Sequence, residues 1–251
     1  MTDHLPALPE DWDRCLCVVA HPDDIEYGAA SAVARWTAQG KQVTYLLAGR
    51  GEAGIDGLHP DKAAPLREAE ERAGAREVGV EVLEFLDHRD GVIEYGPALR
   101  RDIVRSIRRH RPQIIVSGNF EVRGPMGMAN QADHRAVGLA TLDAARDAGN
   151  RWIFPELEAE DLEPWGGVRY ACFGGSERPT HGVDVTGEPL RRGIASLAAH
   201  AEYTKGLGAG GPDPEPMLTW AARQGGSRMG VQAAVLFEVY ALTFEGPPPW
   251  L

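Results

Sequence analysis

The chain has 251 residues, 43% of them hydrophobic, so it can bury the core of a sizeable α/β domain. Its 26 basic and 37 acidic residues give a net charge of −11, which argues against nucleic acid or an anionic membrane surface as a partner. Three cysteines do not make a disulfide framework, and no window has the roughly 18 apolar residues of a membrane span. With a polar N-terminus and no signal peptide, a cytoplasmic location is expected.

Strand-like and helix-like segments alternate four times along the first 150 residues, which predicts a mainly parallel sheet. The expected strands cover 15–20, 43–47, 82–86 and 113–117. The expected helices cover 25–36, 65–78, 97–109 and 136–144. The predicted fold class is therefore α/β and Rossmann-like, with helices on both faces of the sheet.

The last hundred residues are less regular and predict an irregular C-terminal extension within one domain of residues 1–251. The core of that domain is expected over about 15–150 and the extension over about 151–251. Strands are expected at 168–173 and 182–185, helices at 189–204 and 231–240, and a flap or linker at 207–216.

The first strand ends at a short polar motif that begins with His21 and Pro22 and continues with Asp23 and Asp24. Strand-to-helix turns of this kind open onto the ligand-binding edge of an α/β sheet. The spacing of His21 and Asp24 suits a divalent cation with nitrogen and oxygen ligands. The two carboxylates could equally stabilise the start of the next helix, with Pro22 in its first turn.

A second polar cluster favours the site over the helix cap. A Gly-rich loop over 118–130 follows the fourth strand and ends at Asp133 and His134, where another helix begins. Both clusters are thus expected at the same edge of the sheet, which capping alone does not predict.

These residues resemble the LmbE-like, or PIG-L, family of zinc-dependent N-acetylglucosamine deacetylases. The similarity covers roughly residues 15–145 and rests mainly on the motif at 20–26. Supporting matches are the segments 50–54, 67–71, 90–91 and 133–135.

The resemblance implies that His21, Asp24 and His134 hold one Zn²⁺, with open positions for water and substrate. It also implies that Asp23 is the general base, with Asp133 among the catalytic residues. The expected reaction removes an N-acetyl group from a small amino-sugar conjugate. The positions of Arg67 and Asp90 match those that hold sugar hydroxyls in the family, although such a pair can equally be structural.

One departure from the family pattern is Gln131, which stands where the family usually has a histidine. An amide can donate a hydrogen bond to an oxyanion but cannot supply a proton. Three outcomes stay open: another histidine (His59, His181 or His200) takes the role, protonated Asp23 performs both proton transfers, or activity is low.

Two other functions remain as alternatives: a metal-binding homologue of low or no turnover that binds a sugar or other ligand, and an amidase for a larger sugar-thiol conjugate. A nucleotide-binding domain is disfavoured because its glycine fingerprint is missing. The sequence leaves a homo-oligomer open.

Overall fold

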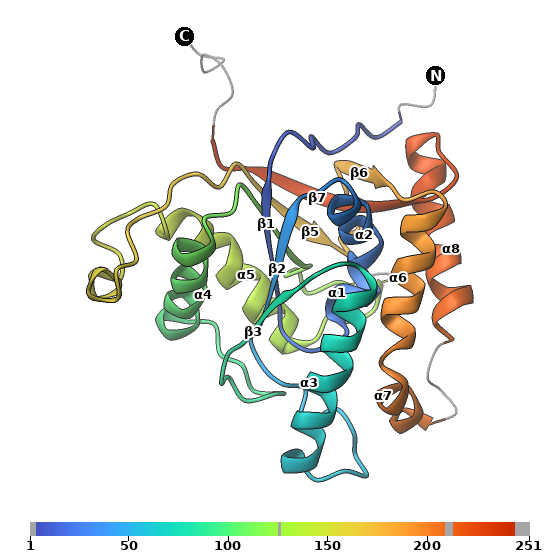
Figure 1. The fold of residues 1–251 in the computed structure, drawn as a ribbon, viewed down its shortest axis with the longest axis horizontal. Helices are drawn as coiled ribbons and strands as arrows, with labels where there is room; N and C mark the ends of the chain where they lie inside the picture. Colours follow the sequence, from blue (N-terminus) through green and yellow to red (C-terminus); the bar gives the residue numbers. More distant parts are fainter. Residues whose placement is uncertain (1–3, 125–126, 209–212, 244–251) are drawn as a thin grey trace.

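A seven-stranded sheet forms the centre of the molecule, with strand order β3-β2-β1-β4-β5-β7-β6 (Figure 1). The computed structural model describes residues 4–124, 127–208 and 213–243. The first five strands run parallel, whereas β7 is antiparallel to both β5 and β6. The strands are β1 (Arg14–Val19), β2 (Gln42–Leu47), β3 (Val82–Phe85), β4 (Ile114–Gly118), β5 (Tyr170–Gly174), β6 (His181–Asp184) and β7 (Ala234–Ala241).

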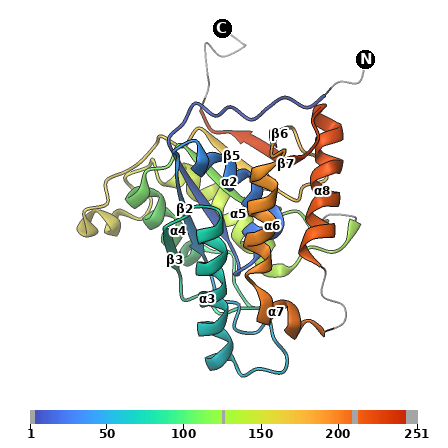
Figure 2. The same ribbon diagram turned by 45° about the vertical axis from the view of Figure 1, so that its right-hand side comes forward.

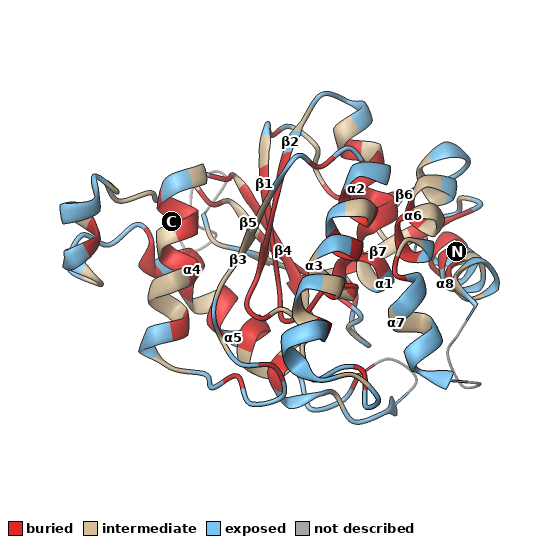
Figure 3. Ribbon diagram, turned by 60° about the horizontal axis from the view of Figure 1, so that its bottom comes forward, coloured by how far each residue is buried: buried red, intermediate tan, exposed pale blue. Residues whose placement is uncertain are grey.

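Helices cover both faces of this sheet, as the sequence predicts (Figures 1 and 2). One face carries α4 (Pro97–His110) and α5 (Ala132–Asp147). The helices on the other side are α1 (Asp24–Gly28), α2 (Ala30–Ala38), α3 (Pro60–Glu77), α6 (Glu188–Ala198), α7 (Ala201–Gly206) and α8 (Pro214–Met229). A 3₁₀ helix, η2, spans Pro155–Glu160. Because β1 lies between two such layers, it is buried along most of its length (Figure 3), which explains its unbroken apolar sequence.

Four predicted helices differ from the structure by more than one residue or are interrupted, and one of them, α5, spans Ala132–Asp147 rather than 136–144. The helix expected over 25–36 is interrupted at Ala29, which separates α1 from α2. Helix α3 begins at Pro60 rather than Pro65, with His59 as its N-cap and Pro65 inside it. The helix expected over 189–204 is broken at His200, whose side chain is fully buried.

The C-terminal prediction of a helix over 231–240 is wrong, because this segment forms β7 between β5 and β6. Short apolar runs do not separate strand from buried helix by periodicity. The preceding helix α8 was not predicted, and residues 209–212 of the expected linker lie outside the described part of the chain. Close packing of α8 requires a glycine at position 225, because a Cβ on Gly225 would lie 2.2 Å from the carbonyl oxygen of Ala234.

The one-domain organisation stays a prediction, supported by a sheet that runs without interruption from the N-terminal strands into β5, β7 and β6. All three cysteines are free and buried. Among the described helices, none has both the length and the hydropathy that crossing a bilayer requires.

Candidate metal centre

The strand order places the two polar clusters of the sequence side by side. The chain runs outward from β1 to β2 and β3, then returns to the other side of β1 as β4. The loops after β1 and β4 therefore diverge at the carboxyl edge, which is where open α/β sheets bind ligands. His21 and Asp24 follow β1, and His134 lies in the first turn of α5 after β4.

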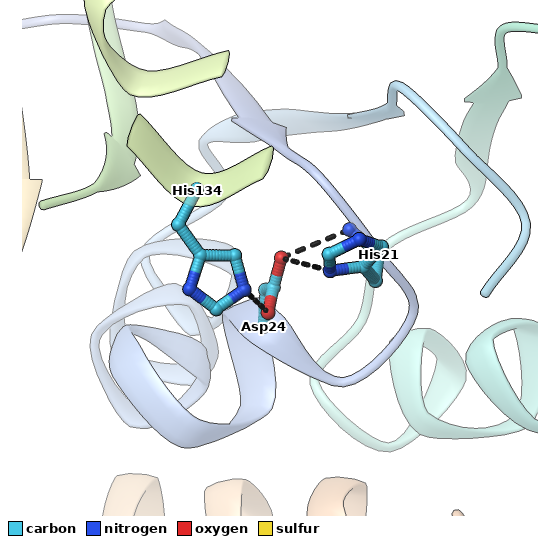
Figure 4. A group of neighbouring side chains, drawn as sticks. All are labelled: His21, Asp24 and His134. Carbon is cyan, nitrogen blue, oxygen red and sulfur yellow. Dashed lines mark hydrogen bonds and ion pairs between the residues drawn. The ribbon is translucent and has the colours of Figure 1, made fainter. Parts of the chain in front are cut away.

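The three predicted metal ligands converge on one point (Figure 4). One carboxylate oxygen of Asp24 lies 3.0 Å from His134 Nε2, and the other lies 3.6 Å from His21 Nδ1. The two imidazole centroids are 5.3 Å apart. One ligand atom from each residue falls within 4.8 Å of the others, so all three can reach a common ion.

Two backbone N–H groups hold the carboxylate of Asp24 in place. Its Oδ2 accepts hydrogen bonds from the backbone N–H groups of Ala20 (3.1 Å) and His21 (2.9 Å). Burial would raise the pKa of Asp24, but His134 and His21 outweigh burial and lower it to about 2. Asp24 is therefore an anion over the whole physiological range.

The far side of the His21 ring is held by two further carboxylates. His21 Nε2 lies 3.0 Å from Asp90 Oδ1 and 3.1 Å from Asp133 Oδ2. Burial alone would lower the pKa of His21, but Asp133 and Asp90 raise it to about 10. With Nε2 engaged as a donor, Nδ1 is left to face Asp24, the arrangement by which outer carboxylates orient metal-binding imidazoles.

His134 has an outer partner as well, because its Nδ1 lies 3.2 Å from Asn130 Oδ1. Asp133, predicted with the catalytic residues, is fully buried and accepts hydrogen bonds from the backbone N–H groups of Gly91 (2.7 Å) and Ile93 (3.1 Å). Its carboxylate therefore connects the loop after β3 to the His21 ring.

Asp23 has an unusual backbone conformation for a residue with a side chain, with φ 86° and ψ −19°. It occupies the N-cap position of α1 but makes no capping hydrogen bond, so helix capping does not explain its identity. The left-handed conformation costs of order 1 kcal/mol or more and is tolerated best by Asn, Asp and Gly. Such strain is typical of functional sites.

The Asp23 carboxylate is buried beside a cation. Arg67 Nη2 lies 3.5 Å from Asp23 Oδ1 and donates a hydrogen bond to the carbonyl oxygen of Pro22. Asp23 Oδ2 is buried without a hydrogen-bond partner among the described residues. Burial raises the pKa of Asp23 well above its usual value, and Arg67 opposes that shift. A carboxylate in this setting has a higher proton affinity than one in water.

Behind Asp23 lies a buried polar cluster, defined here as Glu26, Glu71 and His200, whose grouping the sequence did not predict. Glu71 accepts a hydrogen bond from the backbone N–H of Asp23 (3.0 Å), which helps to hold the strained turn. Glu26 accepts one from Ser196 on α6. Burial lowers the pKa of His200 to about 3, so its ring is neutral.

A cavity of about 190 Å³ opens over the predicted metal ligands and Asp23. Its walls include all three predicted metal ligands, together with Asp23, Arg67, Asp90 and Gln131. The structure thus brings together every predicted site residue except Asp133, which supports His21 from behind. His59, His181 and His200 do not line the cavity, and His200 is buried in the cluster behind Asp23.

Two tyrosines that sequence reasoning missed also line the cavity, Tyr27 from α1 and Tyr203 from α7. The guanidinium carbon of Arg67 lies 3.4 Å from the centroid of the Tyr203 ring. Tyr27 is one residue beyond the motif, a position at which it could have been noticed. Nothing in the irregular C-terminal sequence points to Tyr203.

The donor set fits a divalent cation of the zinc type. Two imidazole nitrogens and one carboxylate oxygen are among its usual protein ligands, and three of them leave room for further ligands from the cavity. The acidic surroundings that raise the pKa of His21 would equally favour a cation at Nδ1. By fold and site, this is an α/β protein with a candidate catalytic metal centre at the switch point of its sheet.

The chain belongs to the PIG-L family. The family model described as GlcNAc-PI de-N-acetylase matches residues 16–145, which contain every predicted site residue. This confirms the family expected from the motifs.

Individual relatives agree with this assignment. Diacetylchitobiose deacetylase from Thermococcus kodakarensis is 29% identical over 182 residues, covering 70% of this chain and 65% of the relative. The chain therefore matches slightly less than two-thirds of that protein's length. The solved structure of N,N'-diacetylchitobiose deacetylase from Pyrococcus horikoshii has a TM-score of 0.81 at 21% identity, covering 93% of this chain and 85% of that one.

The fold alone does not define the reaction. GalB, a 4-carboxy-2-hydroxymuconate hydratase from Pseudomonas putida KT2440, has a TM-score of 0.73 at 18% identity, covering 94% of this chain and all of that one. Function must therefore be argued from the site.

Proposed function

We propose that the protein is a zinc-dependent hydrolase that removes the N-acetyl group from a small N-acetylglucosamine-type conjugate. One observation carries the proposal. The buried carboxylate of Asp23, a residue with a left-handed backbone, lies beside three converging candidate metal ligands in one polar cavity. The family membership and the deacetylase relatives support the same reaction class.

His21, Asp24 and His134 would hold the metal. When bound, Zn²⁺ lowers the pKa of a coordinated water and polarises a carbonyl group. Asp23 is the group placed to accept a proton from water, because its carboxylate lines the cavity, has one oxygen without a partner among the described residues, and has a raised pKa. The same raised pKa would let Asp23 return that proton to the leaving amine.

Arg67 suits a role in substrate binding. Its Nε and Nη1 are buried without hydrogen-bond partners among the described residues, and the side chain lines the cavity. Such donors suit sugar hydroxyls or the carbonyl group of an amide. Both carboxylate oxygens of Asp90 already have partners: Oδ1 lies against His21, and Oδ2 accepts a hydrogen bond from Ala53 N–H. To accept a hydrogen bond from a sugar hydroxyl as well, Asp90 would use a remaining lone pair on one of these oxygens.

Gln131 offers an amide donor in place of an acid. It is the N-cap of α5, makes no capping hydrogen bond and lines the cavity within the same turn as His134. We propose that its side chain donates a hydrogen bond to the developing oxyanion, while Asp23 handles the protons.

Replacing Gln131 tests this role. Gln131→His should change the pH dependence of kcat/KM, because an ionisable group is added beside the reacting amide. Gln131→Leu should lower kcat by about 10²–10³, the usual loss for one oxyanion donor. Steady-state rates from pH 5 to 9 provide the measurement. Unchanged rates and profiles in both variants would show that residue 131 points away from the reaction.

We propose that Asp133 positions His21 rather than contacting substrate. Asp133→Asn should weaken metal binding by about 10–100-fold, as losses of outer partners do. It should also lower the free energy of unfolding by about 1–3 kcal/mol, because Gly91 and Ile93 donate to different carboxylate oxygens and only one of these remains an acceptor in Asn. Competition titration with a chelator and urea denaturation measure the two effects.

The control for this variant is Asp143→Asn on the same helix, where a half-buried carboxylate accepts a bond from Tyr95. It should leave metal affinity unchanged. Equal metal affinity in Asp133→Asn and the wild type would rule out the positioning role.

Acetate release from N,N'-diacetylchitobiose and N-acetylglucosamine, measured with and without added Zn²⁺, tests the proposed activity. Zinc binding without release of a carboxylate from any amide substrate would favour the metal-binding homologue without turnover. Release of a larger acyl group from a sugar-thiol conjugate, but no acetate, would favour the amidase.

A further inference from the structure

A second cavity adjoins the metal centre and is twice as large as the first. Its volume is about 380 Å³, within the range of sites for drug-sized ligands. It lies along the carboxyl ends of β1, β4 and β5, between α1 and α5. Asp24, Tyr27 and His134 line both cavities, so the two spaces meet at the metal ligands.

The walls of this second cavity, called here the apolar cavity, have few free polar groups. Val19, Val116 and Val137 line it from three elements. The Asn119 and Asn130 side-chain amides also border it, but both already donate to loop carbonyl groups.

One hydroxyl group of this cavity is unpartnered. Ser117 Oγ is buried without a hydrogen-bond partner in the described part of the chain. An apolar occupant would leave this oxygen as it is, whereas a polar occupant would bond to it. The residue therefore distinguishes the two kinds of ligand.

The two cavities differ in chemistry as well as size. The first contains Arg67, Asp90 and Gln131, which suit a polar sugar. An amide hydrolysed at the metal must place its carbonyl carbon beside Asp24 and His134. If the amine-bearing sugar occupied the polar cavity, the acyl substituent would extend past these shared residues toward the apolar cavity.

We propose that the apolar cavity binds the acyl group of the substrate, and that the protein prefers N-acyl amino sugars with an unbranched apolar chain of about six to eight carbons over the N-acetyl compound. This inference rests on the proposed amide hydrolysis and specifies its substrate class. An acetyl methyl group would fill only a small part of 380 Å³, and each further methylene removed from water favours binding.

A chain-length series tests the proposal on the zinc-loaded protein. N-acetyl-, N-butanoyl-, N-hexanoyl- and N-octanoylglucosamine should show kcat/KM rising about fourfold per methylene up to hexanoyl. Equal or falling kcat/KM from acetyl to hexanoyl, with acetate still released, would overturn the acyl-site proposal while leaving the deacetylase function intact.

A cavity-filling variant tests whether the preference for longer acyl chains arises in the apolar cavity. Gly118 lines the apolar cavity, and a Cβ built on it has no atom within 4 Å, so Gly118→Val adds volume without a clash at Cβ. The ratio of kcat/KM for the hexanoyl over the acetyl substrate should fall at least tenfold. The matched control is Gly96→Val, at an extended position with the same open space before α4, and it should keep the wild-type ratio.

Binding of free carboxylates gives a readout that does not need turnover. Hexanoate should bind the zinc-loaded wild type at least tenfold more tightly than acetate by calorimetry, and Gly118→Val should remove this difference. Ser117→Ala should bind hexanoate at least as tightly as the wild type. If no amide is hydrolysed but hexanoate still binds more tightly than acetate, the proposed function fails and the apolar site stands. Equal affinities of the wild type for acetate and hexanoate would overturn the proposed acyl site.

Discussion

His134→Ala is expected to abolish both zinc binding and amide hydrolysis. The variant removes one of the three proposed metal ligands and leaves Asp24 without the imidazole that lies 3.0 Å from it. Because loss of an outer partner alone costs about 10–100-fold in metal affinity, loss of a ligand should cost more than 10². Metal content after dialysis and acetate release measure the two effects on the same preparation.

The matched control is His59→Ala, which removes an exposed imidazole at the start of α3. It should keep wild-type metal content and activity. The His134 side chain is only half-buried, so the His134→Ala protein should fold. Circular dichroism can establish this. Full zinc content in folded His134→Ala would contradict the proposed ligand set.

Asp23→Asn should separate metal binding from catalysis. Asparagine keeps the size of the side chain and tolerates the left-handed backbone at this position, so the turn should be retained. It cannot accept a proton, and loss of a general base typically lowers kcat by about 10²–10⁴. Zinc affinity should stay within a few-fold of the wild type, because Asp23 is not among the three proposed ligands.

The chain offers a close control in Asp161→Asn, an exposed aspartate with φ 58° in the same backbone region. This variant makes the same chemical change at another left-handed position and should be fully active. An Asp23→Asn protein with unreduced kcat would show that the base lies elsewhere, and one that has lost its zinc would show that Asp23 is a ligand.

The sheet and the convergence of the two clusters could be predicted because they depend on local patterns and one topological rule. Apolar runs marked β1, β2 and β4, and the reversal of strand order brought His21 and His134 to a common edge. The left-handed conformation of Asp23 was not predictable, because the same residues also suit a helix cap.

The C-terminal third was harder to predict for a physical reason. The apolar run that became β7 has no periodicity that separates a strand from a buried helix. In α8, Gly225 is a residue that ordinarily weakens helices, but here it allows close approach to Ala234. Tyr203 reaches the cavity through long-range packing of α7, a contact that local sequence does not encode.

The measurement that tests the central claim most directly is zinc titration of the metal-free protein, followed by acetate released from N,N'-diacetylchitobiose. If His21, Asp24 and His134 hold one catalytic ion beside Asp23, activity should rise linearly to one equivalent of Zn²⁺ and then level off, and Asp23→Asn should bind the same equivalent without releasing acetate. Acetate release by the metal-free protein at the full rate, or by zinc-loaded Asp23→Asn at the wild-type rate, would contradict it.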